Sequence, residues 1–266
     1  MPRARFEWKL PSRTLFLGER TFLVGVLNVT PDSFSDGGKY DDPDRAFAHA
    51  VALEEAGADI IDIGAESTRP GSKPISEAEE LRRLVPVLKR LRGKLSVPIS
   101  VDTYKAGVAA KALELGAEII NDPTGLTYEP DLVKAVVEHD AGLIINHMRG
   151  KPETWTKLGP MKDPLGTIST ELGAAMHRAV LAGVDKKRIV VDPGLGFGKR
   201  KEQNAEILAL LGRLSGLTLP ILVGPSRKHF VAKESEDQTE FATAAAVTAA
   251  VFGGAHLVRV HDVVAM

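Results

Sequence analysis

The stretch AGADIIDIG, residues 56–64, decides the fold, because its pattern returns along the chain. The same order, a glycine and then a short apolar run that ends in polar residues, appears in LGAEIINDP (115–123), DAGLIINHM (140–148) and GGAHLVRVHD (253–262). A glycine behind a helix can take the left-handed conformation that ends it, and a β-branched run is typical of a strand buried on both faces of a parallel sheet. The repeat therefore predicts successive helix-to-strand units.

Four further apolar runs bring the number of predicted strands to eight: VGVLN (24–28), ISVDT (99–103), IVVDPG (189–194) and ILVGPS (221–226). Helical patterns lie between them. In residues 77–92 the apolar side chains fall on one helical face, and Ser76 with Glu79 predicts a capping box at its start. Two further faces are predicted, formed by Leu165, Ile168, Leu172, Ala175 and Ala179, and by Ile207, Leu208, Leu211 and Leu214.

Eight alternating strand and helix units predict an α/β fold, a (β/α)8 TIM barrel. The segment before the first barrel strand, RFEWKL and then TLFLG, predicts a short N-terminal β-hairpin that closes the bottom of the barrel. We expect residues 1–266 to form a single domain. The sequence stops soon after the eighth strand, so we expect no eighth outer helix within it.

Composition limits the possible partners of the chain. Hydrophobic residues make up 44%, charged residues 26%, and the net charge is -1, which does not favour nucleic acid as a partner. Cysteine is absent, so disulfides and thiolate chemistry are excluded, and the N-terminus has no apolar secretory core. The Ala-rich residues 241–258 are broken by Gly253 and Gly254 and predict a buried helix and a strand, not a membrane span. We expect a cytoplasmic protein without membrane contact.

Polar side chains close the predicted strands, at the end where barrel enzymes place their active sites. They are Asn28, Asp62, Asp102, Asn121, His147, Asp192 and the pair Arg259 and His261. Any one of them could be a helix cap, but capping does not explain the whole series. Because side chains alternate along a strand, Arg259 and His261 share one face. The strand ends therefore indicate a polar site at the barrel mouth.

In order along nearly its whole length, the chain resembles the dihydropteroate synthase family. The motifs are NVTPDSFSDGG (28–38), DIIDIGAESTRPGS (59–72), ISVDTYKA (99–106), IINDPTG (119–125), HMRGKP (147–152), IVVDPGLGFGK (189–199), VGPSRK (223–228) and LVRVHD (257–262). The resemblance implies a transferase of folate biosynthesis that joins 6-hydroxymethyl-7,8-dihydropterin diphosphate to p-aminobenzoate and releases diphosphate. It also implies a sulfonamide target and a homodimer.

For the pterin, the resemblance implies that the Asp192 carboxylate accepts from the 2-amino group and the ring N3–H. Asn121, which both donates and accepts, would meet the remaining edge, and Asp102 would accept from another ring N–H. Lys228 would donate to the ring carbonyl and the N5 side, and the Arg259 guanidinium would stack on the ring.

For the diphosphate, the resemblance implies Mg²⁺ with Asn28 as its protein ligand, since this ion often takes few protein oxygens beside phosphates and waters. Arg259 and His261 would hold the phosphates from the last strand. The sequence suggests no Ser–His or Cys–His nucleophile, so we expect largely dissociative departure of diphosphate, with Asn28, Asp102, Lys228, Arg259 and His261 as catalytic residues.

For p-aminobenzoate, the resemblance implies a site formed by Phe34, Thr68, Pro70, Gly196, Phe197 and Lys228, with the carboxylate near the start of the helix after SRK. The chain departs from the family at His229, where a small hydroxyl residue is usual, and we add His229 to this site. The loop NVTPDSFSDGG is expected to act as a lid. Two alternatives stay open: a corrinoid-linked pterin methyltransferase and a catalytically silent pterin-binding protein.

Overall fold

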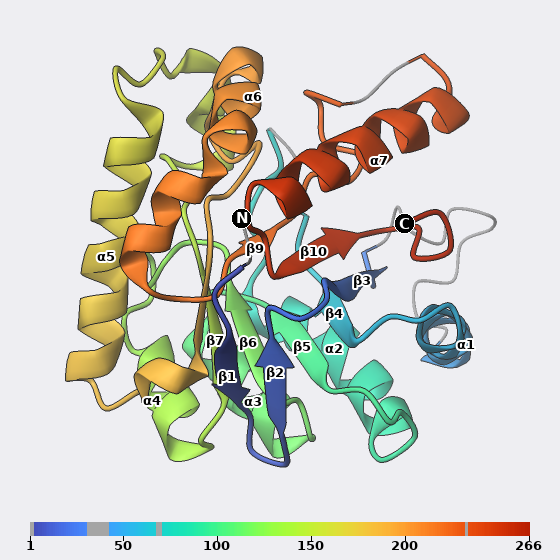
Figure 1. The fold of residues 1–266 in the computed structure, drawn as a ribbon. Helices are drawn as coiled ribbons and strands as arrows, with labels where there is room; N and C mark the ends of the chain where they lie inside the picture. Colours follow the sequence, from blue (N-terminus) through green and yellow to red (C-terminus); the bar gives the residue numbers. More distant parts are fainter. Residues whose placement is uncertain (1–2, 31–42, 68–70, 232–233) are drawn as a thin grey trace.

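Eight parallel strands form the centre of the computed structural model, which describes residues 3–30, 43–67, 71–231 and 234–266 (Figure 1). They are β3 (Phe22–Asn28), β4 (Ile60–Gly64), β5 (Ile99–Asp102), β6 (Ile119–Asp122), β7 (Gly142–Asn146), β8 (Ile189–Asp192), β9 (Leu222–Val223) and β10 (Leu257–Val260). Their order is β8-β7-β6-β5-β4-β3-β10-β9, and a bridge between Val191 and Ile221 joins the two outermost strands. The sheet is thus closed, and the predicted barrel is confirmed.

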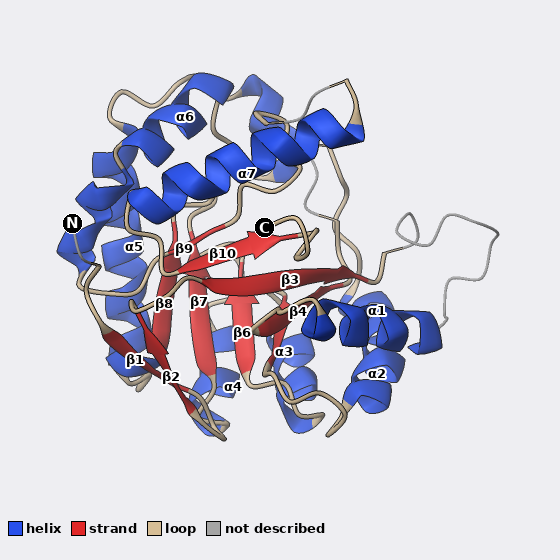
Figure 2. Cartoon of the chain, turned by 45° about the vertical axis from the view of Figure 1, so that its right-hand side comes forward, coloured by secondary structure: helices blue, strands red, loops and turns tan. Residues whose placement is uncertain are grey.

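Helices cover the outside of the barrel (Figure 2). They are α1 (Pro43–Glu55), α2 (Glu77–Leu91), α3 (Ala106–Glu114), α4 (Leu132–Glu138), α5 (Pro164–Leu181), α6 (Lys201–Ala209) and α7 (Glu236–Phe252). The apolar face predicted for α5 is buried throughout. The helix predicted through Leu214 instead ends at Ala209, and Leu211–Leu217 form a separate 3₁₀ helix. Two glycines, Gly212 and Gly216, lie in that second segment, and glycine disfavours a continuous α-helix.

The ends of two helices test finer predictions. At α2 the Ser76 side chain accepts from Glu79 N at 3.2 Å, as expected. The reciprocal half of the capping box does not form, because the Glu79 carboxylate binds Arg82 and Arg83 on the same helix instead. Residues 241–258 divide as predicted into a helix, α7, and a strand, β10, but the helix is buried on one side only, with Phe241 and Phe252 exposed. Within the described part of the chain, no helix has the length and apolar character that a membrane crossing requires.

The N-terminal hairpin consists of β1 (Phe6–Lys9) and β2 (Thr14–Leu17), which pair antiparallel. It lies at the end of the barrel from which the strands start (Figure 1). The Trp8 side chain is fully buried among interior side chains of the strands, and its indole donates to Arg188 O at 2.9 Å. At Gly142 a Cβ would lie 2.5 Å from Leu10 Cδ2, so glycine lets the hairpin approach closely. The predicted closure of the barrel bottom is confirmed.

Strand alternation divides the barrel interior into two levels. Near the hairpin the inward side chains are apolar and fully buried, and include Val24, Ile60, Ile119, Ile144, Val190, Leu222 and Leu257. Further along the same faces, toward the ends of the strands, they become polar. The fold therefore separates a hydrophobic floor from a polar mouth.

Candidate active site

The polar mouth is built by side chains from seven strands. Asn28, Asp62, Asn121, Asn146, Asp192 and Arg259 lie on the inward face, an even number of residues from the apolar floor positions of their own strands. On β5, Ser100 is in register with Asp62 and Asp102 with Asn121, so both join this group. The parallel register sets them beside one another: Asn28 pairs with Gly64, Gly64 with Asp102, and Asp102 with Asn121. The structure thus brings together most of the predicted strand-end residues.

Arg259 occupies the middle of this group. Its Nε donates to Asp62 Oδ2 at 2.6 Å, and its Nη2 donates to Asp102 Oδ2 at 3.2 Å. The same Asp62 oxygen accepts from Asn121 Nδ2 at 3.2 Å. The sequence placed Asp62 at a strand end without a role. In the structure it is the carboxylate that fixes the Arg259 guanidinium.

Several buried polar atoms of the mouth have no hydrogen-bond partner within the described residues. They are Asp62 Oδ1, Ser100 Oγ, Asn121 Oδ1 and Asn146 Oδ1. An unpaired buried polar group costs about 1–3 kcal/mol, and such groups are rare in proteins. Because these four belong to neighbouring inward positions, they indicate a site that a polar, flat ligand would complete.

Asp192 continues this group onto the next strand, β8, where it is in register with Asn146 of β7. Its Oδ1 accepts from Gly194 N at 2.7 Å, in a turn where Gly194 has φ +67° and a Cβ would lie 1.9 Å from His147 O. Burial raises the pKa of Asp192, while the charge of Lys228 opposes that shift. Only glycine permits this turn, which orients the carboxylate.

His147 was predicted to close the fifth barrel strand, β7, toward the site, and this prediction is wrong. Asn146 holds the inward position, so His147, one residue later, points to the outer side, where its Nε2 lies 2.9 Å from Glu171 Oε2 on α5. The period-two alternation from Ile144 would have found Asn146.

Two groups at the mouth have strongly shifted pKa values. Burial raises the pKa of Asp102 to about 7; Arg259 opposes the shift, and the charges of Asp62 and Glu80 add to it. Burial lowers the pKa of Lys228 to about 8. The Lys228 ammonium donates to Leu195 O and lies 4.2 Å from the centre of the Phe197 ring. Such shifts cluster at functional sites.

The loop that carries Gly196 and Phe197 is fixed from below by two residues for which the sequence suggested no role. The buried Lys199 Nζ donates to three carbonyl oxygens, those of His147 at 2.9 Å, Gly194 at 2.7 Å and Phe197 at 3.2 Å. Asn204 Oδ1 accepts from Gly196 N at 2.7 Å. Backbone carbonyl acceptors leave no sequence motif, so only the fold reveals this support.

His261 is oriented by Ser226, a pair that the sequence did not suggest. Ser226 Oγ accepts from His261 N at 3.2 Å and lies 2.9 Å from Nδ1 of the same residue. Ser226 therefore orients the imidazole, since it contacts both the ring and the backbone of one residue.

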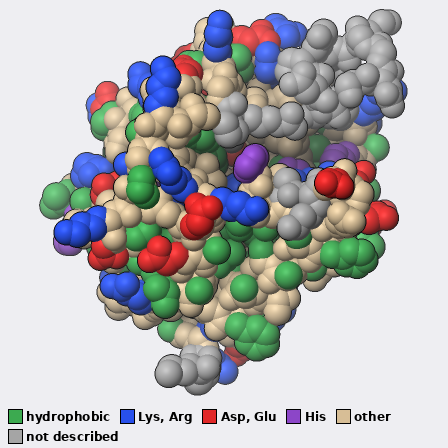
Figure 3. Space-filling model, turned by 90° about the horizontal axis from the view of Figure 1, so that it is seen from above, with side chains coloured by type: hydrophobic (Ala, Val, Ile, Leu, Met, Phe, Trp, Pro, Cys, Tyr) green, Lys and Arg blue, Asp and Glu red, His purple; other side chains and the backbone are tan. Residues whose placement is uncertain are grey.

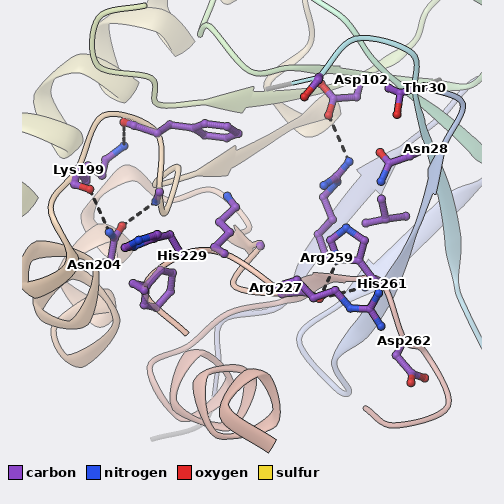
Figure 4. A pocket seen from close by; sticks show the side chains of 18 of the residues that line it. Asn28, Thr30, Asp102, Lys199, Asn204, Arg227, His229, Arg259, His261 and Asp262 are labelled. Atoms are coloured by element: carbon purple, nitrogen blue, oxygen red, sulfur yellow. Dashed lines mark hydrogen bonds and ion pairs between the residues drawn. The ribbon is translucent and has the colours of Figure 1, made fainter. Parts of the chain in front are cut away.

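A cavity of 1360 Å³ opens at the barrel mouth. Figure 4 shows Asn28, Asp102, Arg259 and His261 along one side, with Asn204 and His229 across from them. On the face seen from above, charged and histidine side chains gather near the centre (Figure 3). The predicted residues Phe34, Thr68 and Pro70, and with them residues 31–38 of the expected lid, lie outside the described residues.

The helix after SRK is α7. A turn joins Val231 N to Lys228 O at 2.9 Å, and α7 begins at Glu236, with Glu236 and Asp237 in its first turn. The expected place of the p-aminobenzoate carboxylate near the start of this helix stays a prediction, and acidic residues in that first turn do not favour a carboxylate there.

Oxygen atoms that could hold Mg²⁺ are few at the mouth. No group of three or more His, Asp or Glu side chains suited to a metal occurs among the described residues. At Gly64, however, a Cβ would lie 3.7 Å from Asn28 Oδ1 and 3.8 Å from Asp102 Oδ2, so these two oxygens lie about the same backbone position. This donor set fits an ion that takes most of its ligands from phosphates and waters.

Comparison with known proteins agrees with this geometry. Residues 24–261 match the family described as pterin binding enzyme. The dihydropteroate synthase of Synechocystis sp. is 44% identical, over 96% of this chain and 90% of that protein. The Xanthomonas albilineans dihydropteroate synthase with 4-aminobenzoic acid superposes with a TM-score of 0.90, at 39% identity over 98% of this chain and 94% of that one. The same enzyme in complex with 7,8-dihydropteroate superposes with a TM-score of 0.86, at 37% identity over 97% of this chain and 94% of that one.

Proposed function

The chain belongs to the pterin-binding enzyme family, and from this premise we propose that it condenses 6-hydroxymethyl-7,8-dihydropterin diphosphate with p-aminobenzoate. It is a transferase, a dihydropteroate synthase of folate biosynthesis. The observation that carries the proposal is the set of buried polar atoms at Asp62, Ser100, Asn121 and Asn146, which no described residue satisfies. Three of these atoms, Asp62 Oδ1, Asn121 Oδ1 and Asn146 Oδ1, can only accept, and the amino and ring N–H groups of a pterin are donors.

The pterin would lie deep in the mouth. The Asp192 carboxylate, fixed by Gly194 N, faces the interior and would accept from the 2-amino group and N3–H of the ring. Such charge-assisted hydrogen bonds contribute about 1.5–3 kcal/mol each. Asn121 would use its unpaired Oδ1, and Asp102 would accept from a ring N–H once it is ionised. Lys228 would turn from Leu195 O to the ring carbonyl.

The diphosphate would lie on the side of β10. Arg259 and His261 lie two residues apart at the end of β10, and the imidazole of His261, oriented by Ser226, would donate to a phosphate oxygen. Asn28 Oδ1 would hold Mg²⁺ beside Gly64. When bound, the ion would neutralise charge on the phosphates. Arg259 would add fixed positive charge where the leaving group develops its own.

The reaction breaks the bond between the exocyclic methylene carbon and the bridging oxygen, and the electron pair leaves with diphosphate. The amine of p-aminobenzoate then gives its lone pair to the methylene carbon, and the extra proton goes to solvent. The mouth holds cationic side chains for the leaving oxygen, as this largely dissociative route requires. With oxygen-18 in the bridging position, the label should appear in diphosphate, whereas label kept on the pterin would contradict carbon–oxygen cleavage.

p-Aminobenzoate would lie nearer the rim, between Phe197, Gly196 and Lys228, with His229 at the outer end. Phe34, Thr68 and Pro70 join this site by family resemblance. The Phe197 ring, held by Lys199 and Asn204 beneath its loop, gives the aromatic substrate a flat partner.

We also propose a cytoplasmic homodimer. Phe241 and Phe252 of α7 are 77% and 87% exposed, which is unusual for large apolar side chains on one helix. Light scattering should give the mass of two chains for the wild type and of one chain for Phe252→Glu. A wild-type monomer would contradict the dimer.

The function is tested by diphosphate release. The purified protein should release diphosphate only with both substrates and Mg²⁺, and a sulfonamide should block it. Calorimetry should show that Asp192→Ala loses most of its affinity for the pterin; unchanged affinity would contradict the assigned pterin site. Methyl transfer to a corrinoid protein without diphosphate release would favour the methyltransferase alternative. Pterin binding without turnover would favour the catalytically silent pterin-binding protein.

A further inference from the structure

A second buried ion cluster, which the mechanism above does not use, lies behind the loop from β4 to α2. The Lys105 ammonium is 2.6 Å from Glu66 Oε2 and makes a short contact with Glu80. The three side chains are 7%, 12% and 1% exposed, in the order Lys105, Glu66, Glu80. Ion pairs this buried are little screened by solvent, so each partner is held in place.

Lys105 is positioned by the end of β5. It follows Asp102 by three residues, and its backbone N–H donates to Thr103 Oγ1 at 3.2 Å. Burial alone would lower the pKa of Lys105, but the hydrogen bonds to Glu66 and Glu80 outweigh burial and raise it. The side chain is therefore a permanent cation, shared between a loop carboxylate and a helix carboxylate.

Glu66 joins the two ends of the β4–α2 loop. Its Oε2 accepts from Ile75 N at 3.0 Å, and its Oε1 accepts from the Tyr104 hydroxyl at 3.1 Å. The Glu66 carboxylate thus connects residue 66 to residue 75 by a hydrogen bond. Its ion pair with Lys105 connects both to the barrel. Two further bonds hold the loop nearer its tip: Ser72 Oγ to Ser67 O at 2.6 Å, and Gly71 N to Pro152 O at 3.2 Å.

This loop reaches the substrate cavity, since Glu66 and Ser67 line it. We propose that Lys105 is a positioning residue for the second substrate: through Glu66 it holds the described residues of the β4–α2 loop, of which Glu66 and Ser67 line the cavity, in place for p-aminobenzoate. The inference rests on the proposed function. The deep pterin groups Asp192 and Asn121 have no bond to this cluster, so pterin binding should not depend on it.

The cluster supplies its own matched control. Glu66→Gln cuts the charged link to the loop and leaves Lys105 paired with Glu80. Glu80→Gln removes the other carboxylate and leaves Lys105 paired with Glu66. Each variant keeps one buried cation with one buried anion, so both are expected to fold. The two variants differ in whether the ion pair between Lys105 and the loop residue Glu66 is kept.

Steady-state kinetics at pH 8.5, above the titration of Asp102, measure both substrates separately. Glu66→Gln should raise the KM for p-aminobenzoate about tenfold, with kcat and the KM for the pterin diphosphate within about twofold of wild type, since a lost charged hydrogen bond is worth roughly that factor. Glu80→Gln should leave all three within about twofold. Hydrogen exchange at Ile75 should quicken only in Glu66→Gln.

Lys105→Met alone leaves two buried carboxylates without a cation and is expected to destabilise the fold. The double variant Lys105→Met/Glu80→Gln leaves only the Glu66 carboxylate without a cation, and Glu66 still accepts from Ile75 N and the Tyr104 hydroxyl, so this variant should fold and should reproduce the raised KM of Glu66→Gln. If Glu66→Gln keeps the wild-type KM, or if Glu66→Gln and Glu80→Gln raise it equally, the positioning role is overturned. A wild-type protein that makes no dihydropteroate would instead refute the proposed function, and the inference with it.

Discussion

The floor and the mouth of the barrel interior come from the same strands and differ in how their side chains are satisfied. At the floor, Trp8 of the hairpin and Ile144 of β7 are fully buried among apolar neighbours, and the indole N–H has its acceptor. At the mouth, only two residues beyond Ile144, Asn146 keeps a buried oxygen without a described partner. Within two residues of β7, from Ile144 to Asn146, the interior changes from complete apolar packing to polar groups that need a ligand.

This difference teaches where stability and activity reside. Apolar burial contributes about 25 cal/mol per Å², so the floor stabilises the fold. Unpaired buried polar groups oppose folding, so the mouth is retained for what it binds. Changes at the floor should alter unfolding without altering turnover, and changes at the mouth should do the reverse.

The largest effect is expected at Arg259. Arg259→Lys keeps the charge, but an ammonium cannot bridge Asp62 and Asp102 as the planar guanidinium does. We expect kcat/KM to fall about 10³-fold, or about 4 kcal/mol, with little change in the free energy of unfolding. Stopped assays and urea titration measure the two quantities. Loss of stability with turnover intact would reverse our assignment of the mouth.

The next effect belongs to the floor. Trp8→Ala removes a fully buried indole from the barrel bottom and should lower the free energy of unfolding by about 3 kcal/mol, with kcat of the folded fraction unchanged. Phe16→Ala on the same hairpin is the control, because Phe16 is 67% exposed and should cost little. A kcat that falls in step with stability would show that floor and mouth are not independent.

A smaller effect should follow pH through Asp102. Its pKa of about 7 means that the free enzyme gains the acceptor carboxylate as pH rises, so kcat/KM for the pterin substrate should climb about tenfold per unit below pH 7 and stop climbing above it, until Lys228 loses its proton near pH 8. Asp102→Asn should abolish this step and reveal any contribution from substrate ionisation.

The same group links pH to stability with the opposite sign. Because folding raises the Asp102 pKa, the folded state holds this proton more tightly than the unfolded state, and the contribution to stability is lost as pH rises from about 4 to 7. Asp102→Asn should therefore lose less stability over that range than wild type. An identical pH dependence in both proteins would exclude the raised pKa.

The smallest effect is expected at Asn146. Asn146→Ala removes an unpaired buried carbonyl oxygen, so the free protein should be as stable as wild type or slightly more so. Pterin affinity should fall by about 1 kcal/mol, as for one neutral hydrogen bond, which calorimetry can resolve. Unchanged affinity would place the ligand away from β7.

The sequence sufficed for the eight strands, because each combines a short apolar run with a polar end, and in four of them a glycine also precedes the apolar run. It also sufficed for the strand-end groups Asp102, Asn121, Asp192 and Arg259, since their inward direction follows from alternation. It failed where partners are distant in sequence or are backbone atoms. The links from Lys105 to Glu66 and from Lys199 to three carbonyls depend on which loops become neighbours, and no local pattern encodes that.

The barrel closes at β9, which has only two residues, and it meets β8 through the single bridge between Val191 and Ile221. This seam has fewer ladder bonds to break than any other strand pair, so local opening should begin there. The segment that follows β9 carries Ser226, Lys228 and His229. Local opening at this seam would therefore loosen the region of the second substrate while the other strands stay paired, and product could leave without unfolding of the barrel.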